Sequence, residues 1–377
     1  MSEQPQPMTI GVLKTPNDSR VCLLPKEVKR LTGELALNIL FESGLGSSLE
    51  IEDDAYLQAG AKCQSRESIF RNSDTIVSIN HTFSEVEMKG GCCFIGIFNP
   101  LFHDSKFVIY KKHSATVYSL DLLPRTTLAQ PMDVLSSMAS LAGYRATVKA
   151  AELYNSVFPM FTTAAGTLTP VKILVLGAGV SGLQAIATAR RMGAIVEAFD
   201  VRKSAGEEVR SLGATFIEVE GYTESSNAGG YAVEQSEAYQ KKQKELIHNH
   251  ILTANIVIST ANIPGRKAPL LIETHSVEAM QPGSVIIDLA AEQGGNCELS
   301  KNNETISHNG VTILGNSSLS TEIPSAASKL LSNNFFSFLK YKQKAESQED
   351  DPLLNACQIM NEGEWTHPHF TKQLQPA

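Results

Sequence analysis

Cysteines are few in this sequence of 377 residues, and no regular spacing relates them. A disulfide framework or a zinc site needs cysteines or histidines at close, repeated spacings such as CxxC, so neither is expected here. Scattered thiols instead fit the reducing environment of the cytosol. The six cysteines are Cys22, Cys63, Cys92, Cys93, Cys297 and Cys357.

Long apolar runs and an excess of basic residues are also absent. The longest apolar stretches, such as Ile173–Leu176, are strand-sized, whereas a membrane helix needs roughly 20 apolar residues. The polar start of the chain has no apolar core of the kind that marks a signal peptide. Lys and Arg total 32 against 40 Asp and Glu, and phosphate contacts need clustered positive charge. We therefore expect a cytoplasmic chain that neither spans a bilayer nor binds nucleic acid.

Short apolar, β-branched runs alternate with helical patterns along most of the chain. This alternation indicates parallel sheets covered by helices on both faces. The predicted fold class is α/β, with two Rossmann-like lobes that have mainly parallel sheets, are joined by long helices and enclose a cleft. The predicted strands lie at 8–13, 37–42, 75–80, 92–98 and 115–120 in the first lobe, and at 171–177, 194–200, 215–220, 254–260, 284–290 and 311–315 in the second.

Two long helical patterns, at 132–153 and 326–341, separate the lobes. The tail after Ala345 is polar and interrupted by three prolines, so we expect it to be partly ordered at best. The expected first lobe comprises residues 1–130 and about 325–377, and the expected second lobe comprises about 131–324.

A glycine motif, G-x-G-x-x-G, occupies residues 177–182 between a predicted strand and a predicted helix. This context is the one in which the motif binds a dinucleotide. Gly177 permits the tight turn, Gly179 lets the backbone approach a pyrophosphate, and Gly182 lets helix and strand pack closely. The helix N-terminus adds free N–H groups and a partial positive charge for the phosphates.

An acidic residue, Asp200, ends the following strand, 200 − 182 = 18 positions after the last glycine. A carboxylate there accepts hydrogen bonds from the ribose 2′-hydroxyl and repels a 2′-phosphate, which favours NAD over NADP. Arg202 lies two positions further on and softens that preference. The alternative interpretation is an ordinary glycine turn followed by a solvated aspartate.

No residue stands out as the proton carrier that a dehydrogenase acting on an alcohol or amine needs. The histidines include two H-x-H pairs, His248/His250 and His367/His369, but both pairs lie in polar segments that favour solvated histidine over a metal site. We therefore expect no metal. A reaction without a proton to move, direct hydride passage between two nicotinamides, fits this pattern.

Over about residues 8–370 the chain resembles the alanine dehydrogenase/pyridine nucleotide transhydrogenase family. The segments that carry the resemblance are NDSRVCLLP (17–25), DDAYLQAGA (53–61), RTTLAQPMDVLSSMASLAGYRA (125–146), GAGVSGLQAIATARRMGAIVEAFDVR (177–202), TANIPGRKAPLLI (260–272) and PGSVIIDLAAEQGGNCELS (282–300).

The resemblance also separates the two branches of the family. Alanine dehydrogenases carry a lysine, a histidine and an aspartate where this chain has Ser78, Phe98 and Glu292. The residues that bind pyruvate and relay its proton are therefore missing. The resemblance consequently favours the transhydrogenase branch.

The resemblance implies roles for single residues. The family's R-x4-Q-x2-D-x2-S loop, which contacts the nicotinamide, corresponds to Arg125, Gln130, Asp133 and Ser136. A guanidinium, an amide and a hydroxyl can hold the carboxamide and orient the ring. The alternative, that Asp133 or Gln130 caps the helix beginning nearby, is compatible with ligand binding. Tyr231, after two glycines, matches the tyrosine of a mobile loop that closes over bound nucleotide. The implied cofactor-binding residues are Gly177, Ala178, Gly179, Val180, Ser181, Gly182, Asp200, Val201, Arg202, Tyr231, Ala261 and Glu292.

The resemblance further implies a function and partners. The chain would be the NAD(H)-binding subunit of a Re/Si-specific, proton-translocating transhydrogenase, passing hydride from NADH to NADP⁺ held by a partner subunit. A homodimer, an NADP-binding subunit and a membrane-spanning subunit are implied, and the last would hold the chain peripherally at the cytoplasmic face of the inner membrane. Two alternatives remain: an alanine dehydrogenase-like amino-acid dehydrogenase, and a non-catalytic NAD(H)-sensing module.

Overall fold

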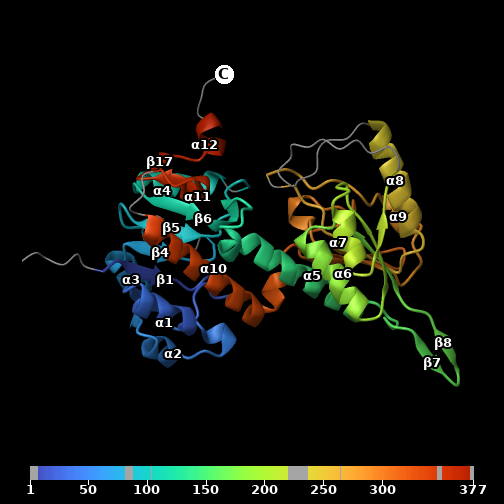
Figure 1. The fold of residues 1–377 in the computed structure, drawn as a ribbon, viewed down its shortest axis with the longest axis horizontal. Helices are drawn as coiled ribbons and strands as arrows, with labels where there is room; N and C mark the ends of the chain where they lie inside the picture. The colour runs from blue at the N-terminus through green and yellow to red at the C-terminus, as the bar shows by residue number, and fades with distance from the viewer. Residues whose placement is uncertain are drawn as a thin grey trace, which may run out of the picture. The chain divides into compact units, whose positions relative to one another are not determined.

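The computed structural model describes residues 7–80, 88–102, 104–219, 237–263, 265–345 and 350–373 (Figure 1). The chain forms two compact units. The first unit comprises Met1–Ser137 and Ile323–Ala377, and the second comprises Met138–Glu322. The chain passes from the first unit to the second within helix α5 (Val134–Leu153).

The first unit is built on an eight-stranded sheet in the order β17-β16-β6-β5-β4-β1-β2-β3. The six strands from β3 to β6 are parallel, and their order is that of a doubly wound fold. The strands are β1 (Thr9–Val12), β2 (Asn38–Glu42), β3 (Lys62–Gln64), β4 (Thr75–Val77), β5 (Cys93–Gly96), β6 (Thr116–Ser119), β16 (Gln358–Asn361) and β17 (Glu364–Trp365). The helices are α1 (Pro25–Glu34), α2 (Asp53–Gln58), α3 (Arg66–Asn72), α4 (Val108–Lys112), α10 (Pro324–Ala345), α11 (Pro352–Cys357) and α12 (Pro368–Gln373).

The tail contains more structure than its polar composition predicts. Strand β16 pairs antiparallel with β6 and extends the sheet of the first unit. Helix α11 begins at a real cap, because the side chain of Asp351 accepts hydrogen bonds from the N–H groups of Leu353 and Leu354. Within the tail, residues 350–373 therefore contain helices and strands that contribute to the first unit.

The second unit is built on a seven-stranded sheet in the order β11-β10-β9-β12-β13-β15-β14. Six strands are parallel in the doubly wound order, and β14 joins antiparallel at the edge. Buried side chains fill the sheet's two faces beneath the helices, which confirms the predicted α/β class. The strands are β9 (Lys172–Leu176), β10 (Ile195–Phe199), β11 (Thr215–Ile217), β12 (Ile256–Ser259), β13 (Val285–Asp288), β14 (Glu304–His308) and β15 (Val311–Gly315). The helices are α6 (Val180–Arg191), α7 (Ala205–Ser211), α8 (Glu237–Ile251) and α9 (Thr274–Glu278).

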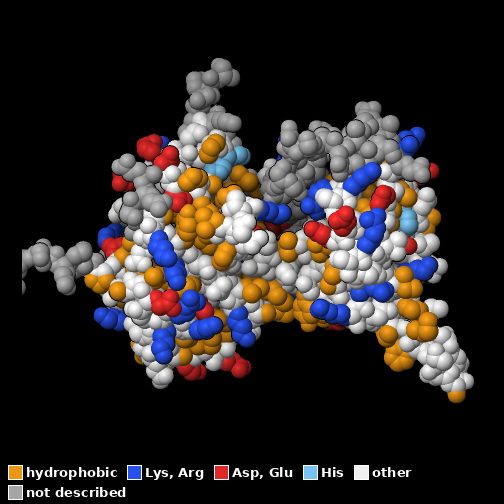
Figure 2. Space-filling view, in the orientation of Figure 1, with side chains coloured by type: hydrophobic (Ala, Val, Ile, Leu, Met, Phe, Trp, Pro, Cys, Tyr) orange, Lys and Arg blue, Asp and Glu red, His pale blue; other side chains and the backbone are white. Residues whose placement is uncertain are grey.

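A small hairpin of the second unit lies outside its main sheet (Figure 1). Its strands are β7 (Phe161–Thr163) and β8 (Gly166–Leu168), and every residue of both is exposed. Apolar side chains are among them, as Figure 2 shows: Phe161 is 47% exposed, Leu168 is 53% exposed, and the preceding Met160 is 63% exposed. Such side chains gain little burial within the hairpin's own unit.

Among the described residues, no helix combines the length and the apolar character that crossing a membrane requires.

Candidate functional site

The glycine turn of the second unit links β9 to α6 and has the backbone that its sequence predicts. Gly177 lies at φ +97°, a left-handed conformation that side chains rarely adopt. A Cβ atom at Gly182 would lie 1.8 Å from the carbonyl oxygen of Gly177, so only glycine allows α6 to approach the strand this closely. Thr260 closes the turn from the neighbouring strand, because its Oγ1 donates to the same carbonyl at 3.0 Å.

The turn leaves room for a ligand beside Gly179. A Cβ atom at Gly179 would meet no protein atom within 4 Å. Ser181 Oγ is buried yet has no hydrogen-bond partner among the described residues. An orphaned buried hydroxyl is costly unless a ligand or water satisfies it. The open backbone at a helix start is the feature that a pyrophosphate group fits.

Asp200 lies just beyond the carboxyl end of β10 and holds the turn. Its Oδ2 accepts from the N–H of Ala178 at 2.8 Å. The guanidinium of Arg202 donates to both carboxylate oxygens of Asp200, from Nε to Oδ1 at 3.0 Å and from Nη2 to Oδ2 at 3.0 Å. The Asp200 side chain is 8% exposed and that of Arg202 is 30% exposed, so this is a largely shielded ion pair. Arg202 therefore lies where the sequence placed it, beside the acidic residue.

Asn296 organises the segment that follows β12, and sequence reasoning did not single it out as a site residue. It is fully buried. Its Oδ1 accepts from the N–H of Ala261 at 3.0 Å, and its Nδ2 donates to the carbonyls of Ala261 and Pro269, each at 2.8 Å. Asn296 thus fixes both backbone groups of Ala261, a predicted cofactor-binding residue. The only sequence signal was its place beside the GG pair of the AAEQGG stretch.

The remaining predicted cofactor-binding residues of the second unit have simpler environments. Val180 begins α6 and is 38% exposed. Val201 packs partly against the core of the sheet. The side chain of Glu292 is exposed, and its N–H donates to Ser317 Oγ at 3.0 Å. Tyr231 lies outside the described residues.

The four predicted nicotinamide-positioning residues belong to the first unit, at the end that leads into α5. Asp133 caps this helix: its Oδ1 accepts from the N–H of Ser136 at 2.8 Å. Its Oδ2 accepts from Ser136 Oγ at 2.6 Å, so these two residues are directly joined. Arg125 and Gln130 are both exposed, and both lie on the segment between β6 and α5. The structure therefore shows the capping role that the sequence had left open for Asp133.

Two of the three positions that differ from alanine dehydrogenases, 78 and 98, are buried in the first unit. Ser78 is buried, and its Oγ donates to the carbonyl of Asn80 at 2.9 Å. Phe98 packs edge-on against Phe107 in the aromatic core of the first unit. A carboxyl group close by, Asp121, accepts a hydrogen bond from Ser119 Oγ, and burial raises its pKa above the ordinary range. Neither position 78 nor position 98 carries an acid or base that takes up a proton near neutral pH.

The first H-x-H pair, His248 and His250, shares no hydrogen-bond partner among the described residues. His248 Nδ1 lies 2.8 Å from Ser276 Oγ, whereas His250 Nδ1 lies 2.7 Å from Glu197 Oε2. The two rings of this pair therefore bond to different residues. Among the described residues, no cluster of three or more His, Cys, Asp or Glu side chains is arranged to hold a metal ion.

Comparison with known proteins places this geometry in a family. The family model described as alanine dehydrogenase/PNT, N-terminal domain, matches residues 14–142, and the C-terminal domain model matches residues 146–368. The first part of NAD(P) transhydrogenase subunit alpha from Rhodospirillum rubrum is 38% identical over 96% of this chain and 97% of its own length.

Solved structures agree with these matches. The crystal structure of transhydrogenase from Sinorhizobium meliloti is 37% identical and has a TM-score of 0.85 over 95% of this chain and 99% of that one. L-alanine dehydrogenase, at 22% identity, has a TM-score of 0.81 over 97% of this chain and 98% of that one, and shares the fold. With both domain models matched across most of its length, the chain belongs to the alanine dehydrogenase/PNT family.

Proposed function

We propose that the chain is the NAD(H)-binding alpha subunit of an NAD(P) transhydrogenase. The observation that carries the proposal is the 38% identity to the Rhodospirillum rubrum subunit over nearly the whole of both chains. The geometry also fits the proposal, because the glycine turn has room for a dinucleotide and neither Ser78 nor Phe98 is an acid or base that takes up a proton near neutral pH. Bound NADH supplies the hydride, so this chain's own residues need to hold and orient the nucleotide.

The second unit holds the adenine half of the nucleotide in this proposal. The backbone at Gly179, at the start of α6, donates to the pyrophosphate. Asp200 accepts from the ribose hydroxyls, while Arg202 neutralises its charge without displacing it. Asn296 keeps the segment at Ala261 rigid, which shapes the wall of the site.

The first unit orients the nicotinamide in this proposal. Asp133 is already engaged as the cap of α5, so its part is to fix the hydroxyl of Ser136. That hydroxyl donates to the carboxylate and keeps its lone pairs for the carboxamide N–H of the nicotinamide. Arg125 and Gln130 supply donors for the carboxamide oxygen. Orientation of the ring matters because hydride transfer requires the two carbons nearly in contact.

Partner subunits complete the reaction in this proposal. An NADP-binding subunit holds the acceptor nucleotide, and a membrane-spanning subunit couples the transfer to proton movement and keeps the chain at the cytoplasmic face of the inner membrane. The chain forms a homodimer, for which the exposed apolar hairpin β7–β8 offers a surface. Sedimentation of the double variant Phe161→Ser, Leu168→Ser tests this role. A dimer that resists both substitutions would exclude the hairpin as the contact.

Reconstitution with the NADP-binding subunit tests the proposed reaction. NADH labelled with deuterium on one face of C4 is mixed with NADP⁺ and both subunits, and NADPH is analysed by mass spectrometry. We expect deuterium in NADPH from only one of the two labelled diastereomers, and none when either subunit is omitted. Transfer from both diastereomers would contradict face specificity, and no transfer from either would contradict the proposal.

The same preparation discriminates the two alternatives. An alanine dehydrogenase-like enzyme would oxidise NADH with pyruvate and ammonium using this chain alone, and we expect no such turnover. A sensing module would bind NADH and a partner but leave NADPH unlabelled. Proton translocation is tested by rebuilding the assembly in lipid vesicles and following the internal pH during transfer.

A further inference from the structure

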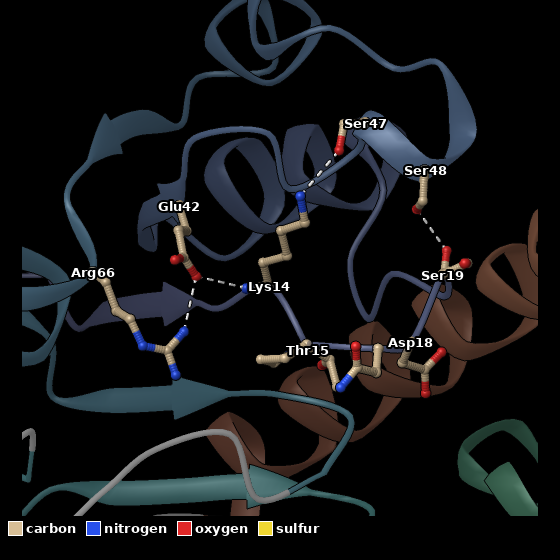
Figure 3. Close-up of a pocket in the computed structure, with 10 residues that line it drawn as sticks. Lys14, Thr15, Asp18, Ser19, Glu42, Ser47, Ser48 and Arg66 are labelled. Atoms are coloured by element: carbon tan, nitrogen blue, oxygen red, sulfur yellow. Dashed lines mark hydrogen bonds and ion pairs between the residues drawn. The ribbon is translucent and has the colours of Figure 1, made fainter.

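The first unit contains a cavity, lined by several charged and hydroxyl-bearing residues, that the proposed reaction does not use. Its volume is about 700 Å³, within the range of small-molecule sites. The cavity lies outside the carboxyl ends of β1, β2 and β3 (Figure 3), the edge where open α/β sheets bind ligands. Its walls are residues 14–19, Glu42, Ser47, Ser48 and Arg66, all of which belong to the first unit.

Glu42 repeats in this unit the arrangement of Asp200 in the other. Each carboxylate stands at or just past the end of the second strand of its sheet and accepts the N–H of a residue that follows the first strand. The distance is 2.9 Å from Lys14 N to Glu42 Oε2, and 2.8 Å from Ala178 N to Asp200 Oδ2. Each carboxylate also pairs with an arginine, since Arg66 Nη1 lies 3.1 Å from Glu42 Oε2. Glu42 therefore has, in the first unit, the placement that Asp200 has in the second.

The turn beside Glu42 differs from the glycine turn in one respect that sets the ligand. No glycine follows β1; the turn instead carries Lys14, whose Nζ donates to Ser47 Oγ at 3.2 Å (Figure 3). Within the described part of the chain the Lys14 ammonium takes part in no ion pair, so two of its N–H donors stay available. A side-chain cation thus replaces the backbone donors of a glycine loop.

The charges around the cavity leave an anion as the missing partner. Asp18 is neutralised by Arg20 at 2.6 Å and Glu42 by Arg66, so the charge of Lys14 is the one unmatched among these described side chains. Glu42 uses Oε2 for its bonds to Lys14 N and Arg66, which leaves Oε1 to accept from hydroxyl groups. An ammonium without an ion pair and a carboxylate oxygen on the wall of the same cavity suit a ligand with a phosphate and a hydroxyl pair.

We propose that this cavity binds a phosphate monoester that carries adjacent hydroxyl groups, with Lys14 holding the phosphate and Glu42 accepting from the hydroxyls. A ribose phosphate and a nucleoside monophosphate share this chemistry. The site is separate from the glycine turn, so the two can be filled at once.

Calorimetric titration of the full chain tests the proposal, with ribose 5-phosphate, AMP, ribose and inorganic phosphate as probes. Each titration is run with and without saturating NADH, and NADH affinity is measured on every variant. We expect ribose 5-phosphate to bind whether or not NADH is present, and more tightly than ribose or inorganic phosphate. The affinities for AMP and ribose 5-phosphate are then compared under saturating NADH. Tighter binding of AMP would identify a nucleoside monophosphate as the better ligand. Tighter binding of ribose 5-phosphate would identify the sugar phosphate.

Two variants and one control assign the contacts. Lys14→Gln should lower the affinity for ribose 5-phosphate about tenfold or more, which is the loss expected when one hydrogen bond to a charged group is removed. Glu42→Gln should lower the affinity for ribose 5-phosphate but leave the affinity for inorganic phosphate unchanged. The control Lys26→Gln removes a lysine of the same unit whose side chain is 83% exposed and lies outside the cavity, and it should change nothing.

Several results would overturn the proposal. These are the absence of saturable binding at millimolar ligand, equal affinities for ribose 5-phosphate and inorganic phosphate, and an unchanged affinity in Lys14→Gln. Displacement of ribose 5-phosphate by NADH would move the binding to the glycine turn and reject the site. Intact NADH binding alongside any of these results would leave the proposed transhydrogenase function standing.

Discussion

Two glycines of the same turn should respond to alanine in opposite ways. At Gly179 a Cβ atom meets no protein atom within 4 Å, and the backbone at φ −79° accepts alanine without strain. At Gly182 a Cβ atom would lie 1.8 Å from the oxygen and 2.9 Å from the carbon of the Gly177 carbonyl. One methyl group therefore enters the space proposed for the pyrophosphate, and the other enters the protein itself.

The structure sets the size of both effects. Gly182→Ala forces helix α6 away from β9, and overpacking of this kind costs about 1–3 kcal/mol. In a unit of this size each kcal/mol lowers Tm by about 2–4 °C, so a fall of about 2–12 °C is expected. Gly179→Ala should leave Tm unchanged or slightly raised. It should lower the affinity for NADH by roughly ten- to hundredfold, since one hydrogen bond to a charged phosphate contributes about 1.5–3 kcal/mol.

Circular dichroism on heating and NADH fluorescence titration measure the two quantities on the same preparations. The informative outcome is the contrast within the pair, because each variant is the control for the other. If Gly179→Ala bound NADH as tightly as the unmodified chain, the pyrophosphate would not lie against this turn. If Gly179→Ala lowered Tm as much as Gly182→Ala, a Cβ atom at position 179 would have to clash with the protein, contrary to the structure.

Three further predictions concern single side chains. Asp200→Ala removes the ribose acceptor and the ion-pair partner of Arg202, so the ratio of NADPH affinity to NADH affinity should rise about tenfold. A constant ratio in paired titrations would refute the proposed role of Asp200. Asn296→Ala leaves three backbone groups without partners, which should lower the free energy of unfolding in urea by about 1–3 kcal/mol and lower the affinity for NADH. An unchanged affinity for NADH would show that Asn296 contributes to stability alone. Burial, and then the charge of His369, lower the pKa of His367 below its ordinary value of 6.5, so the folded chain favours the neutral ring. Stability should then fall as pH drops through 6.5, and His367→Asn should flatten the dependence of Tm on pH between about 7 and 5; an equal slope would exclude this group.

The sequence was most informative where burial is complete. The strands β9, β12 and β13 are covered on both faces and therefore appear as continuous apolar runs, and the glycine motif has a backbone requirement that only glycine meets. The strands β3 and β16 escaped prediction because they are short and lie toward the sheet's margins, where polar residues are tolerated.

Two features of the candidate site depend on contacts that spacing does not reveal. Asn296 bonds to backbone groups 35 and 27 positions earlier, and nothing in the AAEQGG stretch predicts those partners. Asp133 was expected to contact ligand or to cap a helix, and only the geometry shows that its carboxylate already serves Ser136. Local patterns find local roles, whereas partners supplied by a distant loop need the folded chain.

The return of the tail to the first sheet has a consequence for biosynthesis. On the ribosome, every strand of the second unit has emerged before Gln358–Asn361 is translated, so the nucleotide-site unit can fold while the other still lacks β16. Until that strand arrives, β6 has an open hydrogen-bonding edge of the kind that recruits other chains. A stop codon anywhere between residues 323 and 357 should therefore yield a product that keeps the glycine turn but aggregates through the unsealed margin of the first sheet.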